Sequence, residues 1–214
     1  MDQMEIRQLV ARQRAYFQSG ATLPARARVE ALRALRSAVA AREEELNDAL
    51  RADLGKSAFE SYMCEVGMVL SELTYMIRRT PAFAADRRVR TPLAQFAARS
   101  YVKPSPYGTV LIMSPWNYPL LLTLDPLIDA LAAGNTAVVK PSAYSPATSR
   151  VIARLLAECF PPEHVSVVTG GRQENACLLE QKFDYIFFTG SQAVGREVLL
   201  HAAQYLTPVT LELG

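Results

Sequence analysis

The sequence has few of the residues that build disulfide frameworks and metal centres. Its 214 residues include 3 cysteines and 2 histidines, and no two cysteines form a Cys-x-x-Cys pair. An odd number of widely spaced cysteines argues against a disulfide framework or a zinc site. We therefore expect a protein of a reducing, cytoplasmic compartment, in which Cys64, Cys159 and Cys177 are small buried packing groups and not nucleophiles.

The sequence also lacks a long apolar run, a secretory signal and a strong net charge. Its longest apolar stretch surrounds Thr109–Met113, far shorter than the ~20 residues of a membrane helix. The N-terminal residues contain no apolar segment of the signal-peptide type. A net charge of +2 argues against nucleic-acid binding through bulk charge. A composition of 50% hydrophobic and 21% charged residues is typical of a globular domain.

The first 80 residues have helical periodicity. Apolar residues follow the 3.6-residue period from Ile6 to Phe17. Pro24 suits the first turn of a second helix, whose apolar face from Val29 to Leu50 predicts that it continues to Gly55. A capping box, Ser57-Ala58-Phe59-Glu60, begins the next helix. Its apolar stripe is predicted to pack in the core and consists of Phe59, Met63, Val66, Leu70, Leu73 and Ile77.

Residues 78–99 are basic and contain two prolines. One interpretation is a patch that binds anions or a lipid surface. The other, which we favour, is a solvated arm whose charges keep a sheet edge from aggregating. The basic residues are Arg78, Arg79, Arg87, Arg88, Arg90 and Arg99.

From residue 100 onward, short apolar segments alternate with helical ones. Strands without polar alternation are typical of a sheet that helices cover on both faces. Five strands with four crossovers predict an α/β fold with a Rossmann-like open parallel sheet. Gly134 is expected to end the first helix, and Ser145 to cap the second at Pro146. The predicted strands are Thr109–Ser114, Thr136–Lys140, Val165–Val168, Asp184–Phe188 and Pro208–Leu213, and the predicted helices are Pro119–Ala133, Pro146–Cys159, Arg172–Gln181 and Ala193–Tyr205.

Polar and glycine-rich segments follow the strands. Parallel strands end at the same edge of a sheet, which is where such sheets bind ligands. We call this the ligand edge. The segments expected there are Ser114–Pro119, Lys140–Ala143, Thr169–Gly171, Thr189–Gly195 and Glu212–Gly214.

Two of these residues have a functional and a structural interpretation that the sequence leaves open. The Asn117 amide suits an oxyanion donor, or it caps the helix that begins near Pro119. Lys140 suits a contact to a phosphate or ribose, or it extends to solvent at a strand end.

The segments after the last two strands are equally ambiguous. The turn from Gly190 to Gly195 suits a phosphate at a helix N-terminus, or it is an ordinary strand-to-helix turn, since it lacks the Gly-x-Gly-x-x-Gly fingerprint. Glu212 is either a partly buried general base or an edge-strand residue facing water. His164 and His201 have no partners at metal-binding spacing and are interpreted as surface or capping residues, so no metal site is predicted.

Taken together, the motifs resemble the aldehyde dehydrogenase superfamily in order and spacing over residues 104–214. The N-terminal helices fit more loosely, and the short stretch before Pro115 resembles the compact class-three branch. The motifs are Pro115-Trp116-Asn117-Tyr118-Pro119, Ala133-Gly134-Asn135, Lys140-Pro141-Ser142, Phe188-Thr189-Gly190-Ser191, Val194-Gly195 and Leu211-Glu212-Leu213-Gly214.

The resemblance implies roles for these residues. Asn117 is similar to the donor that stabilises a thiohemiacetal oxyanion, and Glu212 to the base that activates water against a thioester. Lys140 is similar to the ligand of the adenosine ribose. The cofactor-binding positions that the resemblance implies are Ser114, Pro115, Trp116, Lys140, Ser142, Gly170, Gly190, Ser191, Val194 and Gly195.

The resemblance also implies an organisation and an activity. Residues 1–80 correspond to the helical part of the cofactor domain, 81–103 to an oligomerisation arm of a homodimer, and 104–214 to the NAD(P)-binding core. The implied reaction is oxidation of an aldehyde to a carboxylic acid with NAD or NADP. An acyl-CoA or acyl-phosphate reductase and a non-catalytic, truncated cofactor-binding fragment are the alternatives.

The sequence departs from the family pattern in two places. The family's catalytic cysteine lies well beyond the Leu-Glu-Leu-Gly motif, whereas this sequence ends at Gly214. We therefore expect the nucleophile outside these residues, and the isolated chain to be inactive. The family has a glutamate after Lys-Pro-Ser, where this sequence has Ala143. This departure leaves the choice between NAD and NADP open.

Overall fold

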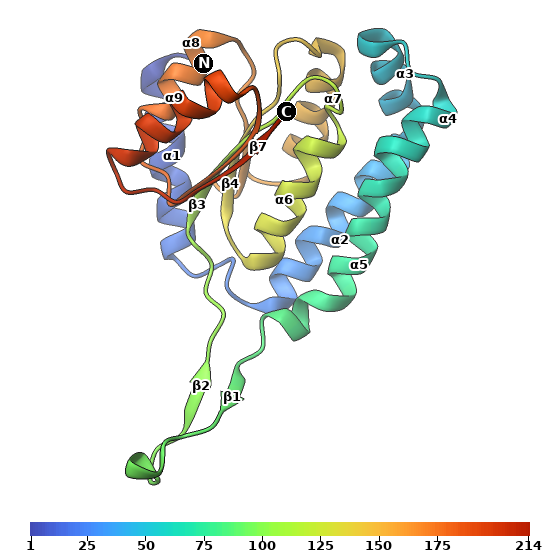
Figure 1. Ribbon diagram of the computed structural model, residues 1–214. Coiled ribbons are helices and arrows are strands. Elements are labelled where there is room, and N and C mark those ends of the chain that lie inside the picture. Colours follow the sequence, from blue (N-terminus) through green and yellow to red (C-terminus); the bar gives the residue numbers. More distant parts are fainter.

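A five-stranded parallel sheet forms the centre of the molecule (Figure 1). The computed structural model describes residues 1–214 and has the strand order β5-β4-β3-β6-β7. The central strands β3 and β4 are buried along their whole length. The strands are β3 Thr109–Met113, β4 Thr136–Lys140, β5 Val165–Val167, β6 Tyr185–Gly190 and β7 Val209–Leu213. The predicted α/β fold with an open parallel sheet is confirmed.

Helices cover both faces of this sheet (Figure 1). The side chains between helices and sheet form two apolar cores. Alternate side chains of a strand point to opposite faces. Val110 and Ile112 of β3 therefore join the core beneath α6 and α7, and Leu111 and Met113 join the core beneath α8 and α9. These helices are α6 Leu121–Ala133, α7 Pro146–Cys159, α8 Arg172–Leu179 and α9 Gln192–Ala203.

The N-terminal helices extend the same two cores. α1 (Gln3–Gln18) packs on the α8 side, and α2 (Ala25–Ala41) packs on α5 and α6. The single helix predicted from Pro24 to Gly55 is wrong, because the chain leaves helical geometry at Arg42 and continues as α3 (Glu43–Leu54). The Arg42 guanidinium pairs with Glu158 on α7. The acidic residues Glu43–Glu45 then suit the N-terminus of a new helix.

The predicted apolar stripe is only partly buried. Val66 and Leu73 are fully buried, whereas Phe59 is 77% and Met63 57% exposed. The reason is a π-helical turn, Tyr62–Val66, between α4 (Ala58–Ser61) and α5 (Gly67–Phe83). A π-turn adds one residue to the helix, so the residues before it rotate away from the face that follows it.

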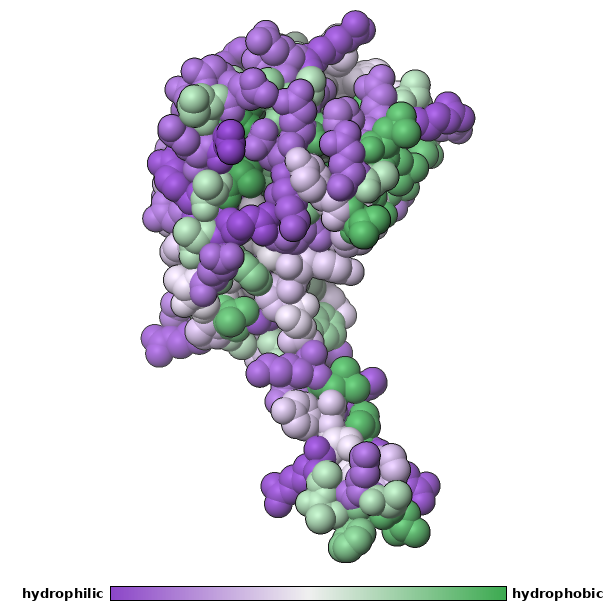
Figure 2. All heavy atoms as spheres, turned by 90° about the vertical axis from the view of Figure 1, so that its left-hand side faces the viewer, coloured by the Kyte–Doolittle hydropathy of each residue, from purple (hydrophilic) through white to green (hydrophobic).

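An antiparallel hairpin projects from the body of the molecule (Figure 1). It pairs β1 (Arg87–Val89) with β2 (Ser100–Val102), and no residue from 81 to 107 is buried. Hydrophobic residues gather at its tip in Figure 2, at the 3-10 turn η2 (Leu93–Gln95) and the Phe96 beside it. The hairpin projects as expected of an arm, but the predicted range 81–103 begins too early, because α5 continues to Phe83. The role of the arm in oligomerisation stays a prediction.

Several predicted helix ends occur as expected. Gly55 and Gly134 follow α3 and α6 in the left-handed conformation, with φ of 70° and 96°. The Ser57 hydroxyl caps α4 by accepting the Glu60 amide at 3.2 Å. Only this half of the predicted capping box forms.

The start of α7 differs from the prediction. Pro146 occupies its first turn as expected, but Ser145 makes no capping hydrogen bond. Asp53, at the end of α3, accepts the amides of Ala147 and Thr148 at 3.0 and 2.7 Å. A carboxylate distant in sequence thus replaces the local cap.

His164 is half-buried among aromatic rings and is not the surface or capping residue that the sequence predicts. Its ring lies between Tyr16 and Phe160, with centroid distances of 5.7 and 5.4 Å. Burial lowers the pKa of His164 to about 4. Three cysteine side chains are free and half-buried, not fully buried as predicted: Cys64, Cys159 and Cys177. None of the helices combines the length and apolar character needed to cross a membrane.

Candidate active site

The structure brings the carboxyl ends of the five strands to one edge. In the register of the sheet, Met113 lies beside both Lys140 and Phe188, and Gly190 lies beside Leu213. The direction of strand addition reverses between β3 and β6. Open parallel sheets bind ligands at such a reversal.

The Asn117 side chain is free at this edge. It is exposed and forms no hydrogen bond. The amides of Leu120 and Leu121 at the start of α6 donate instead to Glu65 Oε2, at 2.8 and 3.1 Å. The structure therefore excludes the alternative in which Asn117 caps this helix.

Lys56 and Glu65, which carry no functional motif in the sequence, contact the loop around Asn117. Lys56 Nζ lies 2.6 Å from Glu65 Oε1 and donates to the Asn117 carbonyl at 3.0 Å. The ammonium also lies 4.0 Å from the centroid of the Tyr118 ring. The only feature of the sequence that could have indicated this contact is Glu65, a carboxylate beside the apolar Val66 within a predicted core helix.

The residues before Asn117 connect the loop to the sheet. Ser114 is buried, and its Oγ lies 2.5 Å from Thr123 Oγ1 on α6. Its amide donates to the Lys140 carbonyl at 3.2 Å. Pro115 is half-buried and Trp116 is 53% exposed, so the indole is open to a ligand.

Lys140 is buried at the end of β4, which excludes the alternative in which it extends to solvent. It is 4% exposed, and Nζ donates to the carbonyls of Pro141 and Gly170 at 2.9 and 2.8 Å. Burial lowers the pKa of Lys140 to about 8, and the charge of Glu174 partly opposes this. An ammonium has three donors, so one remains for a ligand.

The loop after Lys140 is open. Ser142 is half-buried, and its hydroxyl accepts the Tyr144 amide at 3.2 Å. Ala143, between them, is exposed.

The Glu174 carboxylate on α8 folds back onto the turn that precedes this helix. Gly170 has φ of 132°, and a Cβ there would lie 2.3 Å from the Glu174 carboxyl carbon. Glu174 Oε2 accepts the Gly171 amide at 2.7 Å. Hydrogen bonds from its own amide and from Gly171 lower the pKa of Glu174. The Glu174 carboxylate therefore already occupies the position at the N-terminus of α8 where a bound anion would lie.

The turn before α9 has no such carboxylate. Ser191 caps α9 by accepting the Val194 amide at 3.4 Å. A Cβ on Gly195 would lie 2.9 Å from Leu213, and one on Gly190 2.6 Å from the Phe188 ring. Both glycines therefore serve close packing, and the first amides of α9 stay available at the ligand edge.

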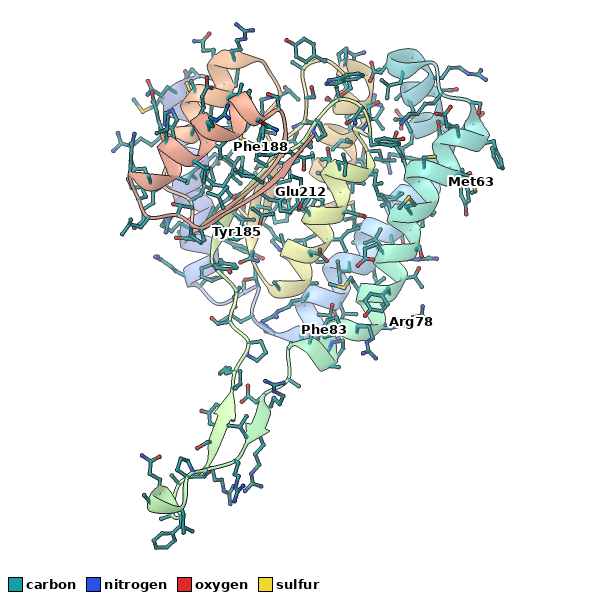
Figure 3. The ribbon with its side chains drawn as sticks, in the orientation of Figure 1. Met63, Arg78, Phe83, Tyr185, Phe188 and Glu212 are labelled. Carbon is teal, nitrogen blue, oxygen red and sulfur yellow. The ribbon has the colours of Figure 1, made fainter.

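Glu212 lies on the edge strand β7 beside Thr189 and is exposed, so the partial burial that one interpretation expected is wrong and the carboxylate faces water as the other expected. Figure 3 places it between β7 and α6. It lines a cavity of about 600 Å³ together with Tyr185 and Asp125. Burial, with the charges of Glu72 and Asp129, raises the pKa of Asp125 to about 6.

No group of three or more His, Cys, Asp or Glu side chains is arranged to hold a metal ion.

The sequence matches the aldehyde dehydrogenase family over residues 1–214. It is 44% identical to aldehyde dehydrogenase family 3 member A2 of Mus musculus, over 96% of this chain and 42% of the relative. It is 42% identical to the dimeric, NADP-preferring aldehyde dehydrogenase of Canis lupus familiaris, over 98% of this chain and 46% of the relative. The chain thus spans less than half the length of these relatives.

Solved structures give the same result. The substrate-bound state of Staphylococcus aureus AldH has a TM-score of 0.96 and 41% identity, covering 100% of this chain and 46% of that one. A Mycobacterium tuberculosis aldehyde dehydrogenase complexed with NAD+ has a TM-score of 0.85 and 32% identity, covering 96% and 42%. With its motifs at one sheet edge and a match over its whole length, the chain belongs to the aldehyde dehydrogenase family.

Proposed function

We propose that this chain is the cofactor-binding portion of an NAD(P)-dependent enzyme that oxidises an aldehyde to a carboxylic acid. The observation that carries the proposal is the free amide of Asn117, exposed while Glu65 caps the helix in its place. The nucleophile in this proposal is a cysteine from the part of the relatives' length that this chain does not span. The substrate is an aldehyde.

Asn117 acts in the first step of the proposed reaction. Attack of the thiolate on the aldehyde carbon forms a C–S bond and moves the carbonyl electron pair onto oxygen. A preorganised amide donor stabilises this oxyanion by about 3–4 kcal/mol. The Asn117 side chain suits this role because no other group uses its N–H donors.

The donors at the ligand edge fit a dinucleotide. Lys140 keeps one N–H after its two carbonyl bonds, and the first amides of α9 have no partner within the helix. These donors suit ribose hydroxyl and phosphate oxygens. The bound cofactor supplies the acceptor for the aldehyde hydride.

We assign the remaining implied positions to the same site. Gly170 fixes the loop that contacts Lys140, and Ser142 lies beside it. Ser191, Val194 and the glycines Gly190 and Gly195 form the turn into α9. Ser114, Pro115 and Trp116 form the wall on the β3 side.

Glu212 acts in the last step. It removes a proton from water, and the resulting hydroxide attacks the enzyme thioester, which releases the carboxylic acid and restores the thiolate. General bases contribute roughly 10²–10⁴-fold. The position of Glu212 on the lining of the cavity supports the role, and its exposure lets water reach the carboxylate directly.

Pre-steady-state kinetics on the full-length protein tests the two roles separately. Glu212→Gln should keep the burst of reduced cofactor and slow the later turnover, because only hydrolysis needs the base. Asn117→Ala should slow the burst itself by roughly 10²–10³-fold. Wild-type burst and turnover in both variants would contradict both roles.

Product analysis separates this proposal from the alternatives. Hydrolysis gives a free acid, whereas a reductase passes its acyl group to coenzyme A or phosphate. Glu212 favours hydrolysis, because a reductase of that kind has no use for a hydrolytic base. Cofactor affinity without turnover of any aldehyde would support the remaining alternative, in which the protein binds the cofactor but does not catalyse a reaction.

Assembly and location complete the proposal. We propose a homodimer through the arm, supported by its exposed apolar tip and by a relative described as dimeric. Three free thiols suit a reducing, cytoplasmic compartment.

A further inference from the structure

A buried ion pair lies directly behind the Asn117 loop. Lys56 and Glu65 are 2.6 Å apart, with side chains 8% and 0% exposed. Replacing a buried ion pair with well-packed apolar groups is often neutral or stabilising. The attraction between the two charges therefore gives little stability by itself, and the other contacts of the pair become informative.

The pair contacts both ends of the segment from Asn117 to Leu121. Lys56 donates to the Asn117 carbonyl at 3.0 Å. Glu65 accepts the amides of Leu120 and Leu121 at 2.8 and 3.1 Å. One ion pair thus satisfies an orphan carbonyl before α6 and two orphan amides at its start.

The backbone around Glu65 is built for this contact. Glu65 lies in the π-helical turn Tyr62–Val66, closed by a hydrogen bond from the Gly67 amide to the Tyr62 carbonyl. A Cβ on Gly67 would lie 2.7 Å from that carbonyl oxygen, so only glycine fits here without a shift. π-turns inside α-helices are frequent at functional sites.

The contact has a direct consequence for Asn117. Asn117 stands three residues before Leu120, the spacing at which an asparagine side chain caps a helix by accepting an amide. If Glu65 did not accept the Leu120 amide, the side-chain oxygen Oδ1 of Asn117 would be the nearest local acceptor to replace it. The Asn117 side chain would then turn toward the helix and away from the ligand edge.

We propose that Lys56 and Glu65 are positioning residues for the oxyanion donor. Glu65 occupies the helix cap so that Asn117 does not, and Lys56 fixes the Asn117 backbone. This inference rests on the proposed function, because it needs Asn117 to act as the donor. The pair itself touches neither substrate nor cofactor in this assignment.

A charge-free variant of the full-length protein tests the idea. Lys56→Met with Glu65→Leu replaces the ion pair with apolar groups, so folding is expected to persist. The burst rate of cofactor reduction should fall about 10–100-fold, approaching the effect of losing the donor, with aldehyde KM within about threefold of wild type. Glu65→Gln, which keeps an acceptor oxygen for the two amides, should recover most of the rate.

A double-mutant cycle with Asn117→Ala gives the readout that a merely structural role would not produce. Residues that act through one another are non-additive. Adding the charge-free substitutions to Asn117→Ala should therefore slow the burst by less than about threefold beyond Asn117→Ala alone. The matched control replaces the exposed pair Arg26–Glu30 on α2 by Met and Leu, and should keep the wild-type rate.

The failures are distinguishable. A wild-type burst rate in a folded charge-free variant, or an effect that multiplies fully with Asn117→Ala, would overturn the positioning role while Asn117→Ala alone still slows the burst. If Asn117→Ala alone has no effect, the proposed function of Asn117 fails and the positioning role fails with it. Should the charge-free variant not fold, Glu65→Gln and Glu65→Leu are compared, and equal burst rates in these two would contradict the inference.

Discussion

Ala143 lies on the exposed loop three positions after Lys140. In the proposed cofactor site, we expect a carboxylate at this position to accept hydrogen bonds from ribose hydroxyls and to repel a 2′-phosphate. Ala143 does neither, so we expect NADP+ to be used at least comparably to NAD+. One charge-assisted hydrogen bond contributes about 1.5–3 kcal/mol, and 1.4 kcal/mol is about tenfold in affinity. Ala143→Glu should therefore shift kcat/KM toward NAD+ by roughly one to two decades.

The control for this change carries the same charge elsewhere. Ala203→Glu adds a carboxylate to an exposed position at the C-terminal end of α9, opposite the end that lies at the ligand edge, and should leave the cofactor ratio unchanged. A wild-type protein that rejects NADP+ a hundredfold, or an unchanged ratio in Ala143→Glu, would contradict the prediction.

The charge on Lys140 predicts a pH dependence of the same preference. Its pKa, lowered to about 8 by burial, means that the ammonium loses its proton as pH rises through this value. A 2′-phosphate loses its cationic partner in that range, whereas a ribose hydroxyl loses less. NADP+ affinity should therefore fall more steeply than NAD+ affinity between pH 7 and pH 9, as measured by fluorescence titration. Parallel curves would rule out a phosphate contact.

His164 predicts an acid-sensitive stability. Its folded-state pKa of about 4 lies below the unfolded value of about 6.5, so its contribution is complete above pH 6.5 and is lost as pH falls toward 4. Between pH 7 and pH 5 this loss is about 1–2 kcal/mol. Urea unfolding of wild type should lose that much more stability than His164→Gln over the same range. Equal losses would show that His164 does not titrate as described.

Site residues that follow or end an apolar strand could be placed at the ligand edge from the sequence, whereas site residues elsewhere in the chain could not. Asn117, Lys140 and Glu212 each follow or end an apolar strand, so the topology alone predicts their common edge. Lys56 and Glu65 act on that edge from 61 and 55 residues away. Such contacts depend on how helices pack, which local periodicity does not contain.

At the scale of elements, a carboxylate from α3 caps α7. Asp53 accepts the amides of Ala147 and Thr148 at 3.0 and 2.7 Å, while Ser145 makes no capping hydrogen bond. Loss of an N-cap costs about 0.5–2 kcal/mol. Asp53→Ala should lower the free energy of unfolding by about 1–2 kcal/mol in denaturant titration, since its carboxylate also favours the helix dipole.

Asp48→Ala is the matched control, because Asp48 is exposed on the same helix and makes no hydrogen bond to α7. It should change stability by less than about 0.5 kcal/mol. An Asp53→Ala variant no weaker than this control would show that Ser145 takes over the cap.

Element prediction succeeded where the pattern was local. Each strand and helix of the sheet region lies within about two residues of its expected ends, because glycine and proline mark those ends. The break at Arg42 and the π-turn at Tyr62–Val66 were missed. In both places the apolar spacing continues through the interruption. A residue at each interruption contacts a distant helix, since Arg42 pairs with Glu158 on α7 and Glu65 accepts the Leu120 amide before α6.

At the scale of the whole molecule, the N-terminal helices and the sheet form one unit. α3 supplies the cap of α7, and the π-turn supplies the cap of α6. Both capped ends face the ligand edge, so the helices before the sheet determine the shape of the site after its strands. The motifs of residues 104–214 therefore describe the site incompletely.

The arm is the one part of the molecule that adds nothing to this unit. Its two strands pair over three residues each, and an isolated two-stranded hairpin is marginally stable in water. Leu93 and Phe96 at its tip are 89% and 84% exposed. Exposed apolar groups on a projecting hairpin indicate that another surface covers them, and we propose a second copy of the protein.

Leu93→Ser with Phe96→Ser should therefore halve the molar mass measured by size-exclusion chromatography with light scattering. The folded core should persist, because no residue from 81 to 107 is buried in it. Leu200→Ser with Leu206→Ser removes two apolar groups, one on α9 and one in the turn after it, that are 71% and 90% exposed, and should leave the dimer intact. A dimer that survives the tip substitutions but dissociates in this second variant would move the interface from the arm to α9.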